Sequence, residues 1–221
     1  MRITSSFIKR TYTSILLGTF VVLSWCMPPL FLSAILGLIL FEIILFEWSK
    51  FFSPTQTLYW LIMPVYPVAP FILLILLNQN PFYQPLVYIL FILVSTFDTG
   101  SYIAGKAYGT HPIAPHISPG KTWQGLIGGY VITTVVLYAL CSILHAPPTS
   151  WLNVIFISLL LCLFSFAGDL FESFLKRRAG IKDSGNILPG HGGFLDRFDS
   201  LLCAVIFFYA ARNYLLTFFN V

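Results

Sequence analysis

Long apolar stretches alternate with short polar connections along the whole chain. We expect membrane spans at residues 12–27, 30–46, 58–77, 86–104, 123–144, 151–174 and 200–219. Several of these stretches approach the roughly 20 residues that a helix needs to cross a bilayer core. Runs such as residues 151–168 do not alternate apolar and polar positions as the strands of a transmembrane barrel do. The pattern therefore predicts an all-α, polytopic transmembrane helical protein with about seven spans.

Prolines mark two irregular places in this pattern. Pro28 and Pro29 separate the first two stretches, which are short and could instead form one re-entrant hairpin. Pro64, Pro67 and Pro70 interrupt the third stretch. A helix broken at membrane depth is tolerated where neighbouring groups satisfy the freed backbone carbonyls. We therefore expect the third span to be irregular and packed against other helices.

The composition agrees with a membrane protein. The 221 residues are 57% hydrophobic and 9% charged, whereas a soluble domain has about 25% charged residues. We expect the first apolar run to be a membrane span rather than a removable signal peptide, because the next run starts at once and the pattern continues along the chain. The four cysteines lie singly inside apolar runs, which is typical of buried packing residues rather than a metal site.

Basic residues lie in alternate connections. They occupy the N-terminal segment, the connection at Lys50, the connection of Lys106 and Lys121, and residues 173–200, while the connections between these carry no charge. Under the positive-inside rule, the N-terminus and the charged connections are cytoplasmic and the C-terminus is outside. This placement explains the net charge of +4, so no nucleic-acid partner is expected.

Acidic residues divide the chain into two regions. Six of the eight lie between Asp98 and Asp199. We therefore expect N-terminal transmembrane helices over residues 1–85 and a catalytic transmembrane region with cytoplasmic motif loops over residues 86–221.

Carboxylates fall near the predicted cytoplasmic ends of three spans. Asp98 lies in the fourth, Asp169 and Glu172 in the sixth, and Asp196 and Asp199 open the seventh. A carboxylate at membrane depth costs several kcal/mol and indicates a functional site by default. Alternatively, an aspartate in a first turn caps its helix, and Asp169 could pair with a lysine. Such local roles explain single residues, but not acids on three helices at one depth.

The segment 173–200 adds the groups that bind phosphate. Glycines at 185, 190, 192 and 193 lie among Lys182, Arg197 and the basic triplet 176–178. Clustered carboxylates suit a hard cation, Mg²⁺ first, and glycine loops with basic side chains suit phosphate. His191 could be a base, a metal ligand or a hydrogen-bonding loop residue. The triplet at 120–122 is not a P-loop, because Pro115 stands where that motif needs glycine.

The segment from Ser173 to Asp199 reads S-x-L-K-R-x4-K-D-x-G-x2-L-P-G-H-G-G-x2-D-R-x-D. It resembles the C-terminal motif of phosphatidate cytidylyltransferases, the CDP-diacylglycerol synthases. The stretches "FDTGSYIAGKAYG", "IAPHISPGKTWQG" and "FAGDLFES" are similar to other blocks of that family. The sequence departs from the family at four positions where charged residues are usual: Thr110, His116, Gly120 and Gln124.

This resemblance implies a reaction in which CTP and phosphatidate give CDP-diacylglycerol and pyrophosphate. It implies an integral multi-pass protein of the bacterial cytoplasmic (inner) membrane, with membrane lipid as a partner and a homodimer possible. The cofactor it implies is Mg²⁺, with room for a second metal ion. The implied catalytic residues are Lys182, Asp183, His191 and Arg197. The implied metal ligands are Asp169, Asp196 and Asp199. The implied substrate-binding residues are Asp98, Lys106, Ser118, Lys121, Thr122, Lys176, Arg177, Gly192 and Gly193.

Two other functions fit parts of the sequence. A CTP-dependent polyprenol or lipid kinase would transfer the γ-phosphate and release CDP. A carboxylate-coupled transporter would place its acids near the midplane on broken helices, whereas these acids gather at one face beside basic connections.

Overall fold

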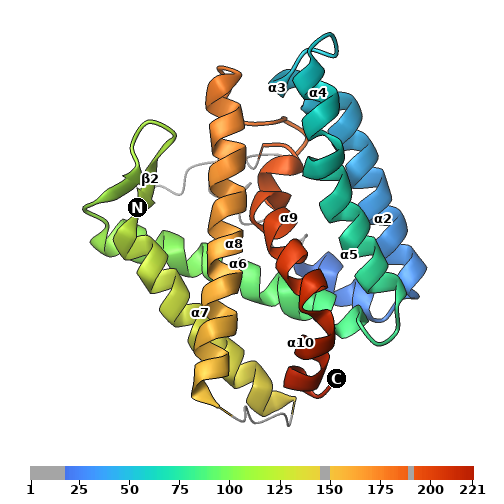
Figure 1. The fold of residues 1–221 in the computed structure, drawn as a ribbon, viewed down its shortest axis with the longest axis vertical. Coiled ribbons are helices and arrows are strands. Elements are labelled where there is room, and N and C mark those ends of the chain that lie inside the picture. The colour runs from blue at the N-terminus through green and yellow to red at the C-terminus, as the bar shows by residue number, and fades with distance from the viewer. Residues whose placement is uncertain (1–17, 145–149, 189–191) are drawn as a thin grey trace.

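The computed structural model describes residues 18–144, 150–188 and 192–221 (Figure 1). Helices dominate these residues, and residues 18–25 are also helical. The named elements are, in chain order, α2 (Pro29–Glu42), η1 (Ile43–Glu47), α3 (Trp48–Phe51), α4 (Thr57–Ile62), η2 (Pro64–Val68), α5 (Ala69–Gln79), α6 (Gln84–Tyr108), β1 (Pro112–Ala114), β2 (Ser118–Thr122), α7 (Trp123–Ile143), α8 (Trp151–Arg178), α9 (Leu195–Ala210) and α10 (Arg212–Phe219). The predicted all-α polytopic architecture is confirmed.

Five helical stretches of the described residues are long and apolar enough to cross a membrane. The bent pair of helices Leu195–Ala210 and Arg212–Phe219 makes a sixth if the two together count as one span. The five are Pro29–Phe51, Thr57–Gln79, Gln84–Tyr108, Trp123–Ile143 and Trp151–Arg178. Each coincides with a predicted span to within a few residues. The first predicted span, 12–27, falls mostly outside the described residues. The total of seven therefore stays a prediction.

The last predicted span, 200–219, is not a straight helix. Helices α9 and α10 meet at 83° around Ala211. Arg212 opens α10, and its Nη1 donates to the carbonyl oxygen of Tyr209 at 2.8 Å. Its guanidinium also lies over the Tyr209 ring, 4.4 Å from the centroid. At the bend, the Arg212 guanidinium thus stays in contact with the C-terminal end of α9.

The proline-rich third span is irregular, as predicted. Tyr66 has non-helical backbone angles (φ −149°, ψ 110°) inside η2, between Pro64 and Pro67. Its side chain is buried, and its ring packs edge-on against Phe171 of α8, with centroids 5.0 Å apart. The break is therefore enclosed by protein, where irregular backbone is tolerated.

Glycines allow the helices that carry the acids to pack closely. A Cβ on Gly129 of α7 would collide with Ser101 Oγ and lie 2.9 Å from the Phe97 carbonyl oxygen, both on α6. A Cβ on Gly168 of α8 would collide with the carbonyl oxygen of Asp199 on α9. Small residues at such contacts let helix backbones approach in a membrane, where van der Waals packing drives association. The α8–α9 contact brings Asp169 and Asp199 together, and the α6–α7 contact places Asp98 near Lys121, which precedes α7.

The long connection after α6 contains an antiparallel hairpin that the sequence pattern did not predict. Strands β1 and β2 pair Pro112 with Thr122 and Ala114 with Ser118. In Figure 1, the α3–α4 connection and the C-terminal end of α8 lie at one end of the molecule. The C-terminal end of α7 and the C-terminus lie at the other. The alternation of charged and uncharged connections, and the membrane side that each end faces, stay predictions.

Candidate active site

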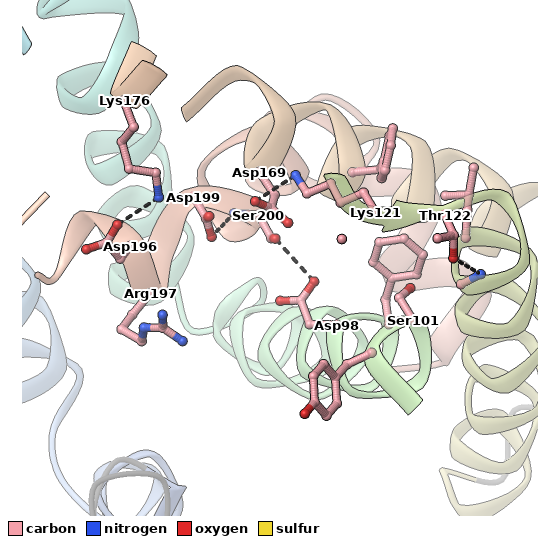
Figure 2. Close-up of a pocket in the computed structure, with 16 residues that line it drawn as sticks. Asp98, Ser101, Lys121, Thr122, Asp169, Lys176, Asp196, Arg197, Asp199 and Ser200 are labelled. Carbon is pink, nitrogen blue, oxygen red and sulfur yellow. Dashed lines mark hydrogen bonds and ion pairs between the residues drawn. The ribbon is translucent and has the colours of Figure 1, made fainter. Parts of the chain in front are cut away.

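A cavity of about 360 Å³ lies between α6, α7, α8 and α9, with the end of β2 at its rim (Figure 2). Among the described residues, four carboxylates and three basic side chains line it. The lining residues are Phe97, Asp98, Ser101, Tyr102, Gly120, Lys121, Thr122, Gly125, Leu126, Phe166, Asp169, Lys176, Asp196, Arg197, Asp199 and Ser200. The excess of acid means that a polyanionic ligand would be repelled unless a further cation enters with it.

The start of α7 directs a lysine into this cavity. Thr122 is the N-cap of α7, and its Oγ1 accepts a hydrogen bond from Gly125 N at 3.1 Å. The preceding residue, Lys121, extends to α8, where its Nζ lies 2.7 Å from Asp169 Oδ1 (Figure 2). The same ammonium lies 5.4 Å from the centroid of the Phe166 ring. The strand-to-helix turn therefore fixes the lysine across the cavity.

Asp196 is held by donors on both of its oxygens. Oδ1 lies 2.8 Å from Lys176 Nζ, and Lys176 also forms an ion pair with Glu172 one turn before it. Oδ2 accepts from Ser184 N at 2.8 Å, Ser184 Oγ at 2.9 Å and Gly193 N at 2.8 Å. Such a carboxylate organises the loop before α9 and has little capacity left for a ligand.

Asp98, Asp169 and Asp199 form a second group of acids, contributed by α6, α8 and α9. Asp98 and Asp199 are each close enough to Asp169 for their charges to interact, and Asp199 also interacts with Asp98. Figure 2 shows Asp98 and Asp169 on opposite sides of the cavity mouth. Ser200 Oγ donates to Asp98 Oδ1 at 3.2 Å. Carboxylates whose charges interact in this way disfavour one another's ionised forms, and a cation beside them would relieve that repulsion.

The donor chemistry of this second group fits Mg²⁺, which prefers carboxylate and water oxygens. Ser101 Oγ, buried at the same cavity, has no hydrogen-bond partner among the described atoms. Within the described ranges, no three acidic, histidine or cysteine side chains close around a single cation position. Of the predicted metal ligands, Asp196 accepts from donors on both of its oxygens, and Asp169 pairs with Lys121 through Oδ1. The magnesium assignment stays a prediction.

The cavity brings together eight of the residues singled out from the sequence. They are Asp98, Lys121, Thr122, Asp169, Lys176, Asp196, Arg197 and Asp199. Seven others do not line it: Lys106, Ser118, Arg177, Lys182, Asp183, Gly192 and Gly193. The remaining one, His191, lies outside the described residues.

The residues that do not line the cavity have contacts of their own. Lys106 lies over the Tyr102 ring, 5.7 Å from the centroid. Arg177 Nε donates to the carbonyl oxygen of Ile117, which joins the end of α8 to the β1–β2 hairpin. Gly192 has a positive φ of 84°, and a Cβ there would collide with Asp196 Oδ2. These positions shape the surroundings of the cavity.

Sequence reasoning missed the neutral part of the lining. Ser101 and Ser200 carry hydroxyls, while Phe97, Tyr102 and Phe166 contribute rings. Hydroxyl and aromatic residues are common in membrane helices, so composition does not identify them. The period of 3.6 could have done so, because Ser101 follows Asp98 by three residues and Phe166 precedes Asp169 by three.

The fold and this site define a polytopic membrane protein with an acid- and lysine-lined cavity between its helices. The profile of the cytidylyltransferase family matches residues 5–215. The chain therefore belongs to the cytidylyltransferase family, as the motif predicted.

Relatives named phosphatidate cytidylyltransferase are similar to this chain over different lengths. The protein of Rickettsia bellii is 35% identical over 215 residues, which are 94% of this chain and 93% of the relative. The protein of Pseudomonas aeruginosa is 42% identical over 137 residues, 62% of this chain and 51% of the relative. The protein of Bacillus subtilis is 45% identical over 118 residues, 53% of this chain and 44% of the relative. The chain thus spans about half the length of several curated relatives and nearly all of another.

Proposed function

We propose that this membrane protein transfers the cytidylyl group of CTP to phosphatidate, giving CDP-diacylglycerol and pyrophosphate. The observation that carries the proposal is the cavity, which gathers carboxylates from three helices with Lys121, Lys176 and Arg197. The family membership and the names of the relatives support the same reaction. We further propose that the cavity faces the cytoplasm of a bacterium, where CTP is made.

The nucleophile of this reaction needs little activation. The phosphate of phosphatidate is a monoester, and the second ionisation of such a group lies near pKa 6 (as in phosphoserine), so it is anionic near neutral pH. An oxygen of this phosphate attacks the α-phosphorus of CTP, and the bond to the pyrophosphate oxygen breaks. No proton has to be removed from the attacking oxygen. The reaction therefore does not require a general base from the lining residues.

The chief barrier is repulsion between two polyanions. Lys121 and Arg197 would contact the phosphates and stabilise the negative charge that develops on pyrophosphate. Lys121 is held in place by Asp169 and by the Phe166 ring, so it would be oriented before the nucleotide arrives. Such preorganisation places the reacting groups in line.

Magnesium would supply the remaining positive charge. Asp169, Asp199 and Asp98 would hold it, since their oxygens face the cavity while those of Asp196 are engaged. When bound, the ion would neutralise phosphate oxygens and the excess of acid in the cavity.

The decisive experiment follows two labels in one assay. Purified protein is incubated with phosphatidate, Mg²⁺ and CTP labelled in either the α- or the γ-phosphate. The proposal requires that α-label enters the lipid and γ-label leaves as pyrophosphate. Incorporation of γ-label into lipid, with release of CDP, would instead indicate a CTP-dependent lipid kinase. No label in lipid from a folded, Mg²⁺-supplied protein contradicts both enzymes and leaves the transporter as the rival.

A further inference from the structure

Glu47 is a buried carboxylate far from the motif in sequence. It ends the π-helical turn η1 inside the stretch Pro29–Phe51, and its side chain has no exposed surface. An ionised carboxylate in such surroundings is costly unless polar groups stabilise it. The partners of Glu47 therefore indicate why an acid stands in this helix.

Two of these partners are the first amides of α9. Helix α9 begins at Leu195, and its N-cap residue Phe194 provides no side-chain cap. Phe194 N donates to Glu47 Oε1 at 2.7 Å, and Leu195 N donates to Oε2 at 2.9 Å. The first amides of a helix lack partners within the helix, and its N-terminus favours negative charge. Glu47 thus caps α9 from a different helix.

The third partner links Glu47 to the site. Ser184 Oγ lies 2.7 Å from Glu47 Oε2 and 2.9 Å from Asp196 Oδ2. A hydroxyl has one proton, so it donates to one carboxylate at a time and keeps both close. Lys50, one turn beyond Glu47, donates through Nζ to the carbonyl oxygen of Ser184 at 2.8 Å. Two residues of the stretch Pro29–Phe51 therefore hold the loop that leads into α9, where Asp196 lies.

Glycines make this approach possible. A Cβ on Gly193 would collide with Glu47 Oε1, and one on Gly185 would lie 3.0 Å from the same atom. The sequence suggested that these glycines allow a phosphate to approach the backbone. In the structure, the carboxylate of Glu47 lies next to both glycines.

We infer that Glu47 is a positioning residue for the active site. By capping α9 and holding Ser184, it sets the place of Asp196, Arg197 and Asp199 at the cavity. The catalytic part of this inference rests on the proposed function, whereas the anchoring of α9 does not.

The test compares Glu47→Ala and Glu47→Gln with Asn78→Ala. Asn78 is equally buried, and its Nδ2 donates to the Pro29 carbonyl oxygen at 2.7 Å and to Ser33 Oγ at 2.9 Å. Asn78→Ala therefore shows the effect of losing buried hydrogen bonds between α2 and α5, and it leaves the loop before α9 unchanged. Amide hydrogen exchange is measured for the segment containing Phe194 and Leu195. CDP-lipid formation is measured as kcat and as KM for CTP on the same preparations.

We expect Glu47→Ala to speed exchange at these amides by about tenfold or more and to lower kcat by a similar factor, since each lost bond to a charged group is worth about a factor of ten or more. The KM for CTP should change less than kcat, because Lys121 and Thr122 keep their places while Arg197 and Asp199 move with α9. Glu47→Gln keeps the size and one acceptor oxygen, so its exchange rate and kcat should lie between those of the wild type and Glu47→Ala. This variant still tests the inference if Glu47→Ala misfolds. Asn78→Ala should leave both readouts near wild type.

If amide exchange at Phe194 and Leu195 is unchanged in folded Glu47 variants, the inference that Glu47 anchors α9 is wrong. Faster exchange with unchanged kcat, or an equal loss of kcat in Asn78→Ala, would overturn the positioning role. If the wild-type protein forms no CDP-lipid, the proposed function fails by itself, and the exchange measurement still decides whether Glu47 holds α9.

Discussion

Lys121 and Asp169 form a 2.7 Å ion pair that crosses the cavity from the end of β2, just before α7, to α8. The ion pair connects the end of β2 with α8, and both elements supply residues of the predicted site. A bound phosphate would have to share the lysine with Asp169, and a bound cation would have to share the carboxylate with Lys121. Each residue of the pair can therefore be tested separately for its ligand.

Replacing Asp169 tests the metal site. Asp169→Asn keeps the size and one acceptor oxygen but removes the charge that attracts Mg²⁺. We expect at least about a 100-fold loss of activity, the scale of removing one major electrostatic contribution, and partial recovery when Mg²⁺ is raised. The measurement is a Mg²⁺ titration of CDP-lipid formation, with Glu172→Gln as the control. Near-normal activity of Asp169→Asn at low Mg²⁺ would leave the metal assignment without support.

Asp196 should behave differently from Asp169. Its oxygens accept from Lys176, Ser184 and Gly193, so Asp196→Asn disrupts a loop rather than a metal site. We expect a free energy of unfolding lower by about 1–3 kcal/mol, together with an activity loss that added Mg²⁺ does not restore. Thermal unfolding in detergent and the same Mg²⁺ titration check both parts. Recovery by Mg²⁺ would return Asp196 to the metal ligands.

Lys121 is expected to act on the nucleotide. Lys121→Met keeps much of the apolar stem but removes the charge, so the KM for CTP should rise by about tenfold or more, which corresponds to the loss of one charged hydrogen bond. The Mg²⁺ requirement should not increase, because Asp169 gains a free oxygen. Arg212→Met is the control, since Arg212 contacts Tyr209 at the end of α9 and does not line the cavity. Equal effects of the two substitutions would argue against a specific role for Lys121.

The close contact of α6 and α7 can be tested through stability. A Cβ on Gly129 would collide with Ser101 Oγ and lie 2.9 Å from the Phe97 carbonyl oxygen. Gly129→Ala should therefore lower the free energy of unfolding by about 1–3 kcal/mol, as overpacking does. Gly37→Ala in α2 provides the comparison, because a Cβ at Gly37 meets no atom within 4 Å. The thermal midpoint should fall in the first variant and hold in the second.

The predicted orientation has its own test. A cysteine at Lys182, in the exposed loop after α8, should react with a membrane-impermeant reagent from the cytoplasmic side. One at Gln79, at the end of α5, should react from the other side. Both are made in a Cys26→Ser background, since Cys26 is the exposed cysteine among the four. The reverse pattern would contradict the charge-based orientation and cytoplasmic access of CTP.

Hydropathy predicted the spans well because a membrane imposes one length and one polarity on them. The exception was 200–219, which was predicted as one span. Mean hydropathy averages Arg212 with its apolar neighbours, so it does not reveal a break in the helix. In the structure that residue lies at a bend of 83° between α9 and α10. The hairpin at 112–122 was also missed, because its strands are too short and proline-rich to show a period of two.

The acids of the site were predictable for a physical reason. Asp98, Asp169 and Asp199 interrupt apolar runs, and a carboxylate there needs an explanation. The same argument applies to Glu47, which was overlooked because it lies in the region assigned to simple spans. Which acids share a cavity and which hold a loop depends on tertiary contacts. The sequence therefore grouped Asp196 with the metal ligands, while its contacts in the structure are with Lys176, Ser184 and Gly193.

The cap that Glu47 provides also orders events while the chain is being made. Its partners Ser184, Phe194 and Leu195 follow it by 137, 147 and 148 residues. At a synthesis rate of about 5–20 residues per second, they emerge roughly 7–30 s after Glu47. During that interval the helix carrying Glu47 is in the membrane without these partners for its carboxylate. The stretch Pro29–Phe51 therefore reaches its final hydrogen bonding only after the chain has been translated as far as Leu195.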